Sequence, residues 1–284
     1  MANLFTSVDK FQTYRENLKS PSIGLVPTMG NLHEGHLSLI RESLLNNETT
    51  IVTIFVNPKQ FGPNEDFEKY PRTLESDLEK INSLDPNIVV LAPNSTKEIY
   101  PDNYTTVVSV ADLTRNLCGA DRPGHFDGVT TIVYRLFAIT KAHNAYFGQK
   151  DYQQLQVIRR MSEDLLLPIK IHMLPIHREE SGLARSSRNQ FLSDKEREVA
   201  LTLTEAILSL ESIIKDKTFI DALSQINSKL EEEIKDENWN YLEILDSTTL
   251  SEVNINTNEV VIAGAYKVGN TRLIDNTLVK IQYA

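Results

Sequence analysis

Cysteine, excess positive charge and long apolar runs are all scarce in this chain of 284 residues. Cys118 is the only cysteine, which excludes an intramolecular disulfide and a cysteine-rich zinc site and fits a reducing compartment. No apolar run approaches the roughly 20 residues that a membrane helix needs. The first twenty residues carry several charges and no apolar core, so we expect no secretory signal and a cytoplasmic protein without a membrane partner.

The balance of charge argues against nucleic acid as a partner. Lys and Arg number 29 against 39 Asp and Glu, which gives a formal net charge of −10. Binding a long phosphate backbone draws on clustered excess positive charge, whereas a small anion needs only a local group of donors. The composition is otherwise that of an ordinary globular protein, and the length suggests about two domains or one large one.

Short apolar runs alternate with helical patterns through the first half of the chain. The run Ile51–Val56 is nearly all apolar and β-branched, as in a strand that is buried on both faces. After a first run at 23–27, the residues Leu37, Ile40 and Leu44 fall on one face of a helix. This alternation predicts an α/β fold with a parallel, doubly wound sheet. The other strands are expected at 88–91, 144–147 and 169–174, and the other helices near 74–81, 129–142 and 151–161.

The pattern changes near residue 177. Long helical patterns follow, and then short alternating runs that are typical of a small antiparallel sheet. We therefore predict an α/β domain over residues 1–176 and a smaller α+β domain over 177–284. The expected helices cover 193–215 and 219–235, and the expected strands cover 241–245, 260–265, 272–274 and 278–281.

The sharpest local signal, PTMGNLHEGH at 27–36, lies between the first strand and the first helix. Its backbone N–H groups should lie at the carboxyl ends of the strands, where open α/β sheets bind ligands and where helix N-termini favour anions. Gly30 and Gly35 lack a Cβ, so a phosphate or a base can approach the backbone closely. His33 and His36 share a helix face and can donate hydrogen bonds to phosphate oxygens during a displacement at phosphorus.

Two other interpretations of this segment are weaker. The histidines could merely bond neighbouring carbonyls at a polar helix start. A zinc site is disfavoured because Leu37 stands where the His-Glu-x-x-His motif needs its second histidine. Neither a Gly-Lys-Ser/Thr phosphate loop nor a Gly-x-Gly-x-x-Gly motif is present.

A second polar cluster, Gly148–Asp151, also stands between an expected strand and an expected helix. Lys150 can pair with a phosphate, and Asp151 can accept hydrogen bonds from ribose hydroxyls. Gln154 falls one helical turn on, on the same side as Lys150. A role for Asp151 as a helix N-cap is compatible with ribose binding.

A third cluster, Gly182–Asn189, contains two arginines that flank two serines. Such a set binds anions, and a loop of this kind could close over a triphosphate and neutralise departing pyrophosphate. The alternative is a solvated basic loop. Its coincidence with the other two clusters favours the functional interpretation.

Single residues elsewhere add to this edge of the sheet. Gln60 follows the second strand and offers both a donor and an acceptor, which suits a small hydroxy acid. Asp77 is a tentative Mg²⁺ contact, with an ordinary surface carboxylate as the alternative. His125, near Arg122, is a further loop contact, while the remaining histidines at 143 and 172 are interpreted as structural.

Taken in their order along the chain, these segments closely resemble those of the pantothenate synthetase (pantoate–β-alanine ligase) family, which is part of the His-x-Gly-His nucleotidyltransferase superfamily. The likeness covers nearly the whole chain, and several independent matches in order are far more specific than one. The motifs that carry it are PTMG…HEGH at 27–36, FVNPKQFG at 55–62, YPRT at 70–73, RPGHF at 122–126, FGQKDYQQL at 147–155, SSRN at 186–189 and TRLIDN at 271–276.

The resemblance implies ATP-dependent condensation of (R)-pantoate with β-alanine through a bound pantoyl adenylate, giving pantothenate, AMP and pyrophosphate. It implies a Rossmann-like ATP- and pantoate-binding domain, a smaller domain that closes over the site, Mg²⁺ and a homodimer. By the same likeness Arg185–Arg188 form a mobile phosphate loop, and Gln60 and Gln154 grip pantoate.

The same likeness implies the remaining site residues, and the proton-donor role falls to His36. The catalytic residues are expected to be His33, His36, Lys150 and Arg188. The residues expected to contact ATP are Met29, Gly30, Asn31, Leu32, His33, Glu34, Gly35, His36, Gly148, Gln149, Lys150, Asp151, His177, Arg185, Ser186, Ser187 and Arg188.

The sequence departs from the commonest family pattern at two of these positions. Arg185 stands where an apolar residue is frequent, and His177 stands where a small aliphatic residue is frequent. The first adds a phosphate contact or points outward. At the second, a backbone contact to adenine would survive.

Two other functions stay open on the sequence alone. A nucleotidylyltransferase would use the same histidines to join ATP to a phosphorylated acceptor, although the neutral Gln60 and Gln154 favour a carboxylate-bearing hydroxy acid. A non-catalytic nucleotide-binding protein would bind ATP without releasing pyrophosphate, and the presence of both histidines speaks against it.

Overall fold

The computed structural model describes residues 3–63, 65–215 and 217–284. The chain folds into two compact units that interleave along the sequence. The first unit comprises the chain up to Val110 together with Arg122–Gly148 and Val157–Pro175. The second comprises Ala111–Asp121, Gln149–Gln156 and Ile176–Ala284, so two short segments of the N-terminal half belong with the C-terminal unit.

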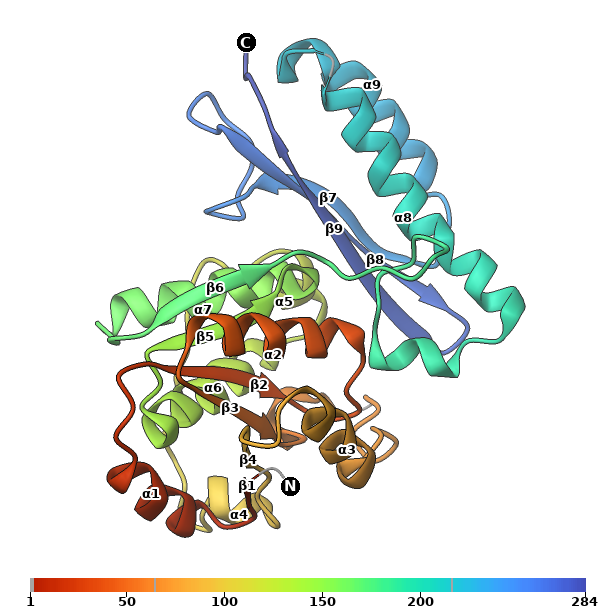
Figure 1. Ribbon diagram of the computed structural model, residues 1–284. Helices are drawn as coiled ribbons and strands as arrows, with labels where there is room; N and C mark the ends of the chain where they lie inside the picture. The colour runs from red at the N-terminus through yellow and green to blue at the C-terminus, as the bar shows by residue number, and fades with distance from the viewer. Residues whose placement is uncertain (1–2, 64, 216) are drawn as a thin grey trace. The chain divides into compact units, whose positions relative to one another are not determined.

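A six-stranded sheet forms the centre of the first unit (Figure 1). Its strand order is β1-β4-β3-β2-β5-β6, and every recorded pairing among the described residues is parallel. Buried faces on both sides explain the near-continuous apolar runs, such as that of β3. The strands are β1 (Asn3–Phe5), β2 (Ile23–Thr28), β3 (Thr49–Ile54), β4 (Val89–Leu91), β5 (Asn144–Gly148) and β6 (Lys170–Leu174).

Helices connect these strands and pack on the sheet. One core cluster joins Val26, Val52 and Val90 of three neighbouring strands to Ile40 of α2 and Ile81 of α3. The helices are α1 (Val8–Asn17), α2 (Glu34–Asn46), α3 (Leu74–Leu84), α4 (Thr96–Ile99), α6 (His125–Thr140) and α7 (Tyr152–Asp164), with short 3₁₀ turns η1 (Pro58–Gln60) and η2 (Gln149–Asp151).

The direction of the strand order reverses at β2. From β2 the chain continues outward through β3 and β4, and it later returns to β5 on the other side of β2. The recorded β2–β5 pairing covers only Gly24 with Asn144 and Leu25 with Ala145, whereas β2 pairs with β3 at six positions. Reversals of this kind are where open α/β sheets bind ligands, at the carboxyl ends of the strands.

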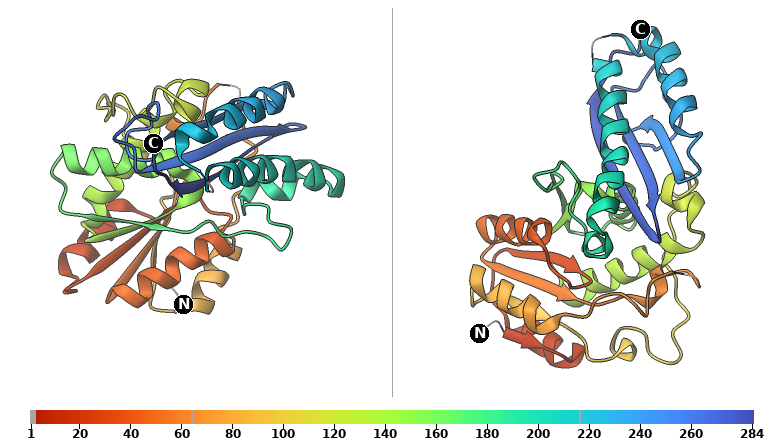
Figure 2. Two further views of the ribbon diagram at one scale, coloured as in Figure 1. Left: turned by 90° about the horizontal axis from the view of Figure 1, so that it is seen from above. Right: turned by 90° about the vertical axis from the view of Figure 1, so that its right-hand side faces the viewer.

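The second unit is built on an antiparallel sheet, β7 (Trp239–Asp246), β8 (Glu259–Val268) and β9 (Thr271–Lys280). Figure 2 shows the long helix α8 (Asp194–Lys215) running beside this sheet, with α9 (Phe219–Glu233) next to it. The remaining elements are α5 (Leu117–Asp121) and the 3₁₀ turn η3 (Ser187–Phe191).

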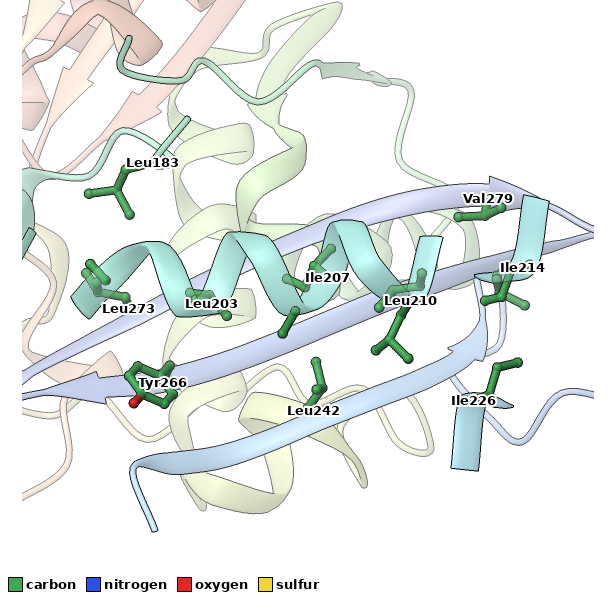
Figure 3. Close-up of a cluster of buried hydrophobic side chains, with 14 of the residues drawn as sticks. Leu183, Leu203, Ile207, Leu210, Ile214, Ile226, Leu242, Tyr266, Leu273 and Val279 are labelled. Carbon is green, nitrogen blue, oxygen red and sulfur yellow. The ribbon is translucent and has the colours of Figure 1, made fainter. Parts of the chain in front are cut away.

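The apolar core of the second unit lies between α8 and the sheet (Figure 3). Leu203, Ile207 and Leu210 of α8 are at most 1% exposed and pack in one cluster with Leu242 of β7. Leu183, which belongs to none of these helices or strands, lies in the same cluster and is 2% exposed. The polar segment before α8 is therefore fixed to this core at Leu183.

The predicted fold class is confirmed: a parallel sheet with helices, followed by a small antiparallel sheet. The separate strands predicted at 272–274 and 278–281 are wrong, because the structure has one continuous strand, β9. Asp275 and Asn276 interrupt its apolar pattern although both are buried. Strand β1 and helices α1, α4 and α5 were not predicted. Among the described residues, no helix combines the length and apolar character needed to cross a membrane.

Candidate active site

The loop that follows β2 is tightly bent. Gly30 has φ +84°, and Asn31 has φ +50°, a region that Gly and Asn tolerate best. A Cβ on Gly30 would lie 3.1 Å from both the Asp77 carboxylate and the side chain of Ile54, so glycine also fits the space. The bend delivers the chain into α2, whose N-cap is His33.

Asp77 of α3 holds this loop. Its Oδ2 accepts a hydrogen bond from the Asn31 N–H at 2.9 Å, and its Oδ1 accepts one from the Leu32 N–H at 2.7 Å. The side chain of Thr73 donates to Oδ2 at 3.2 Å, and Lys80 of the same helix donates to the Leu32 carbonyl at 2.7 Å. Two loop amides therefore find their partner in a carboxylate that is 0% exposed.

The assignment of Asp77 as a magnesium contact stays a prediction beside these observed contacts. Both of its oxygens accept backbone N–H groups, and the side chain is sealed from solvent. Magnesium retains several waters and is bound by one or two carboxylates together with substrate phosphates. The described part of the chain also contains no group of three or more His, Cys, Asp or Glu residues that could hold a metal ion. The role that the structure shows for Asp77 is to hold the loop after β2.

The two histidines meet at the start of α2. The ring centroids of His33 and His36 are 4.0 Å apart, with their planes inclined by 33°. The Nδ1 of His36 accepts a long hydrogen bond of 3.4 Å from the His33 backbone N–H. A neutral imidazole that accepts at Nδ1 carries its proton at Nε2, so this bond assigns His36 as an Nε2–H donor.

Gln60, in the turn η1, lies against the β2 loop. Its amide Nε2–H group donates to the sulfur of Met29 at 3.2 Å, and its Oε1 accepts from the buried Asn57 side chain at 3.0 Å. Asn57 is fixed in turn, since it donates to the Gly128 carbonyl and accepts from the Tyr100 hydroxyl. The structure thus brings together Met29 and Gln60, which the sequence placed on successive strand ends.

The backbone of Gln60 is held by the RPGHF segment. Its carbonyl accepts from His125 Nδ1–H at 2.7 Å and from Arg122 at 3.3 Å. Arg122 also donates to His125 Nε2 at 3.1 Å and forms an ion pair with Glu65, with one N–O distance of 2.6 Å. Burial alone would raise the pKa of Glu65, but the hydrogen bond and charge of Arg122 outweigh it and hold that pKa below its ordinary value. His125 therefore supports Gln60.

Gly128 of α6 is a site-shaping residue that sequence reasoning missed. A Cβ at this position would lie 2.2 Å from the Lys59 carbonyl oxygen and 2.6 Å from the Gln60 nitrogen. Only glycine allows α6 to lie this close to η1. A glycine just before the helix expected at 129–142, and 68 residues after Gln60, gave no signal of that contact before the fold was known.

Lys150 and Gln154 belong to the second unit. Lys150 lies in η2, with a side chain 20% exposed and its Nζ 3.9 Å from Asp151 Oδ2. Gln154, in the first turn of α7, is half-buried. The backbone of η2 is fixed by Asn276 of β9, whose amide donates to the Gln149 carbonyl at 3.0 Å and to the Lys150 carbonyl at 2.9 Å.

The serine–arginine segment is part of the same unit and begins with a small hairpin. Arg178 and Ala184 form an isolated β-bridge, and the Arg185 N–H donates to the His177 carbonyl at 2.9 Å. The sequence predicts a backbone contact between His177 and adenine. The carbonyl oxygen of His177 already accepts this one hydrogen bond within the protein. Ser186 caps the turn η3 by accepting from the Arg188 N–H at 3.2 Å.

Arg178 holds the hairpin to the sheet. It forms a bidentate ion pair with the buried Asp275 at 2.7 and 3.0 Å, and it donates to the Gly182 carbonyl at 3.1 Å. Farther along, Leu192 is also part of the core cluster. The stretch from Arg185 to Arg188 therefore lies between two firmly anchored points.

Comparison with known proteins identifies the family to which this chain is similar. The profile of the family described as pantoate-beta-alanine ligase matches residues 3–278. The chain belongs to the pantoate–β-alanine ligase family. A pantothenate synthetase from Acetivibrio thermocellus is 50% identical over 262 residues, covering 91% of this chain and 92% of that protein. One from Sulfurihydrogenibium is 46% identical, covering 96% and 98%.

Solved structures of the family share the fold. A pantothenate synthetase from Thermus thermophilus superposes with a TM-score of 0.85 at 38% identity, covering 97% of this chain and 98% of that one. A pantoate–β-alanine ligase from Francisella tularensis, described as complexed with beta-gamma ATP and beta-alanine, gives a TM-score of 0.78 at 35% identity, covering 98% of each chain. The predicted family and fold are confirmed.

Proposed function

We propose that His36, Lys150 and Arg188 act on one ATP molecule at the carboxyl ends of β2 and β5. The overall reaction is that of the family: ATP-dependent condensation of pantoate with β-alanine to pantothenate. The observation that carries the proposed site is the reversal of strand order between β2 and β5, because the His33–His36 turn follows one of these strands directly.

Covalent continuity supports the inclusion of Lys150. It stands two residues after Gly148, the last residue of β5, and consecutive Cα atoms are about 3.8 Å apart. Its Cα thus lies within about 7.6 Å of the end of a strand that pairs with β2. The amino end of α2 adds backbone N–H groups that favour a phosphate.

In the first step an oxygen of the pantoate carboxylate attacks the α-phosphorus of ATP. The new P–O bond gives pantoyl adenylate, and the bond to the departing pyrophosphate breaks. We propose that the Nε2–H of His36 and the ammonium of Lys150 donate hydrogen bonds to the phosphate oxygens, where negative charge grows in the transition state. Arg185 and Arg188 neutralise the pyrophosphate, and Gln60 orients pantoate from beside Met29.

In the second step the β-alanine amine attacks the acyl carbon of the adenylate. The C–N bond forms, the C–O bond to AMP breaks, and the amine loses a proton. The mixed anhydride is prone to hydrolysis, so the site has to exclude water until the amine arrives. We propose that the smaller C-terminal domain closes over the nucleotide for this purpose, that Gln154 assists in gripping pantoate, and that the nucleotide contacts predicted from the sequence line the site.

Mg²⁺ supplies charge neutralisation of the triphosphate when bound. We propose that Asp77, which binds the loop before α2, would also contact this ion. We further propose that the enzyme is a cytoplasmic homodimer.

The deciding experiment is isotope exchange between labelled pyrophosphate and ATP. Exchange that requires pantoate but not β-alanine supports a pantoyl adenylate. Mass spectrometry should then show pantothenate and AMP once β-alanine is added. A nucleotidylyltransferase would instead need a phosphorylated acceptor and consume no amine, and a non-catalytic protein would bind ATP without exchange. Either result contradicts the proposal.

A further inference from the structure

Two adjacent residues of β9 contact both cationic segments of the second unit. Asn276 is 3% exposed, and its Nδ2 donates to the carbonyls of Gln149 and Lys150 at 3.0 and 2.9 Å. Its Oδ1 accepts from the Gln149 side chain at 3.3 Å. A single side chain thus fixes the two consecutive carbonyl groups on either side of the Lys150 Cα atom.

Asp275 makes an equally complete set of contacts with the other segment. Its Oδ2 accepts from Arg178 at 2.7 Å and from the Thr204 hydroxyl of α8 at 3.0 Å. Its Oδ1 accepts from Arg178 at 3.0 Å and from the Asn276 N–H at 2.8 Å. Arg178 begins the hairpin that leads to Arg185, so the carboxylate connects that hairpin to the sheet and to α8.

The alternation of a β-strand explains how neighbours reach different segments. Successive side chains point to opposite faces, and Asp275 faces α8 while Asn276 faces η2. The pair stands mid-strand, opposite Gly264 and Ala263 of β8. Both polar side chains are buried, whereas the other buried residues of the sheet are hydrophobic or glycine, and such burial is costly unless the hydrogen bonds are made. Here they are made.

We propose that Asp275 and Asn276 are positioning residues for the ATP site: Asn276 sets the Lys150 segment, and Asp275 sets the hairpin that carries Arg185 and Arg188. The assignment of these cations to ATP rests on the proposed function, whereas the positioning itself rests on the contacts of β9. Neither residue touches a reacting atom. Their effect is to fix where two cationic segments of one unit lie relative to each other.

The sharpest test removes the Asn276 amide. In Asn276→Ala the Gln149 and Lys150 carbonyls lose their donor, and we expect the pantoate-dependent adenylation rate to fall at least tenfold. A displacement of about 1 Å can cost as much as a hundredfold. The loss should appear chiefly in kcat for adenylation, while the attack of β-alanine on pre-formed pantoyl adenylate changes less than threefold.

A double-mutant cycle separates positioning from general damage. If Asn276 acts through Lys150, adding Asn276→Ala to Lys150→Ala should lower the rate by less than threefold. Fully multiplicative losses would overturn the proposal. Asn116→Ala is the matched control, because the Asn116 side chain also donates to a backbone carbonyl within the second unit, that of Leu250 at 2.8 Å, while its backbone carbonyl, which accepts from Gln153, is kept.

Hydrogen exchange provides a readout that does not depend on activity. Asn276→Ala should speed amide exchange at 149–153 at least fivefold, with no such change in Asn116→Ala. Arg178→Lys keeps the charge but loses the bidentate pair, and it should speed exchange at 182–188 without affecting 149–153. Unchanged exchange at the named segment in either variant overturns the proposal. If exchange changes as expected but the wild type catalyses no pantoate-dependent step, the proposed function fails and the positioning stands.

Discussion

The two units hold their site residues in different ways. In the first unit the anchors are separate: Asp77 binds the loop that leads to His36, while Asn57, the N-cap of η1, and His125 of α6 bind Gln60. In the second unit, Asp275 and Asn276 of one strand bind both cationic segments. Separate anchors allow the nucleotide and pantoate contacts to be disturbed independently, whereas a shared anchor couples two segments to one short stretch of backbone.

The largest effect should come from Asp77→Ala. One buried and one part-buried N–H group lose their acceptor, and each unsatisfied group costs about 1–3 kcal/mol, so the free energy of unfolding should fall by about 2–6 kcal/mol. Urea denaturation measures this loss. If the anchors are separate, the folded variant should bind ATP much more weakly but keep its KM for pantoate within threefold. Glu79→Gln, an exposed change on the same helix, is the control and should stay within about 0.5 kcal/mol.

His36→Ala and Lys150→Ala should each lower the adenylation rate at least tenfold, equivalent to about 1.4 kcal/mol of barrier. Each removes one donor to the phosphate oxygens, but the two residues come from different units. Pre-steady-state release of pyrophosphate measures the rate. Lys229→Ala, which removes only the ion pairs with Glu232 and Glu233 on α9, should match the wild type. Wild-type rates for the two site variants would contradict the assignment.

Gly128→Ala tests the contacts that hold Gln60, separately from those by which Asp77 holds the loop after β2. The added Cβ would meet the backbone at Lys59 and Gln60, and overpacking of this kind costs about 1–3 kcal/mol. We expect a several-fold rise in the KM for pantoate with little change in the KM for ATP. Gly62→Ala serves as the control, because its Cβ would find its nearest neighbour at 3.6 Å. Equal effects on both substrates would show that the two anchors of the first unit are linked.

The smallest expected effect is a dependence of stability on pH. Burial, followed by the charge of Lys170, lowers the pKa of His172, whose Nε2–H donates to Asn144 at 2.8 Å. The unfolded chain therefore binds a proton more readily, so this contribution is complete above about pH 6.5 and is lost as the pH falls toward the lower folded value. Urea midpoints at pH 5.5 and 7.5 should differ less in His172→Gln than in the wild type. Equal pH slopes would exclude the effect.

The sequence predicted the parts of the site that follow from local order. A strand followed by a bend and a helix start places His33 and His36 at the end of the strand, whereas the pairing of β2 with β5 became known only from the structure. The sequence did not reveal what Asp77 does, because a carboxylate on a helix looks the same whether it faces water or a loop 45 residues away in the chain.

The interruption of β9 shows the limit most clearly. Asp275 and Asn276 split one strand into two predicted ones, because buried polar residues contradict the apolar pattern of a strand. Their partners, Arg178 and the Lys150 carbonyl, lie 97 and 126 residues away in the chain. Such pairings depend on tertiary structure, so only the departure from the pattern was visible beforehand.

Because the two units interleave along the sequence, the position at which the chain is cut determines which contacts within the second unit are lost. A fragment that stops at residue 176 would contain the whole six-stranded sheet but would leave Gln149–Gln156 without Asn276 and Ala111–Asp121 without Arg272. The complementary C-terminal fragment would contain Asn276 and Arg272 but would lack the two segments that they contact. Split reporters and domain swaps with relatives should therefore exchange the two short inserts along with the C-terminal part, since a single junction separates residues that fold together.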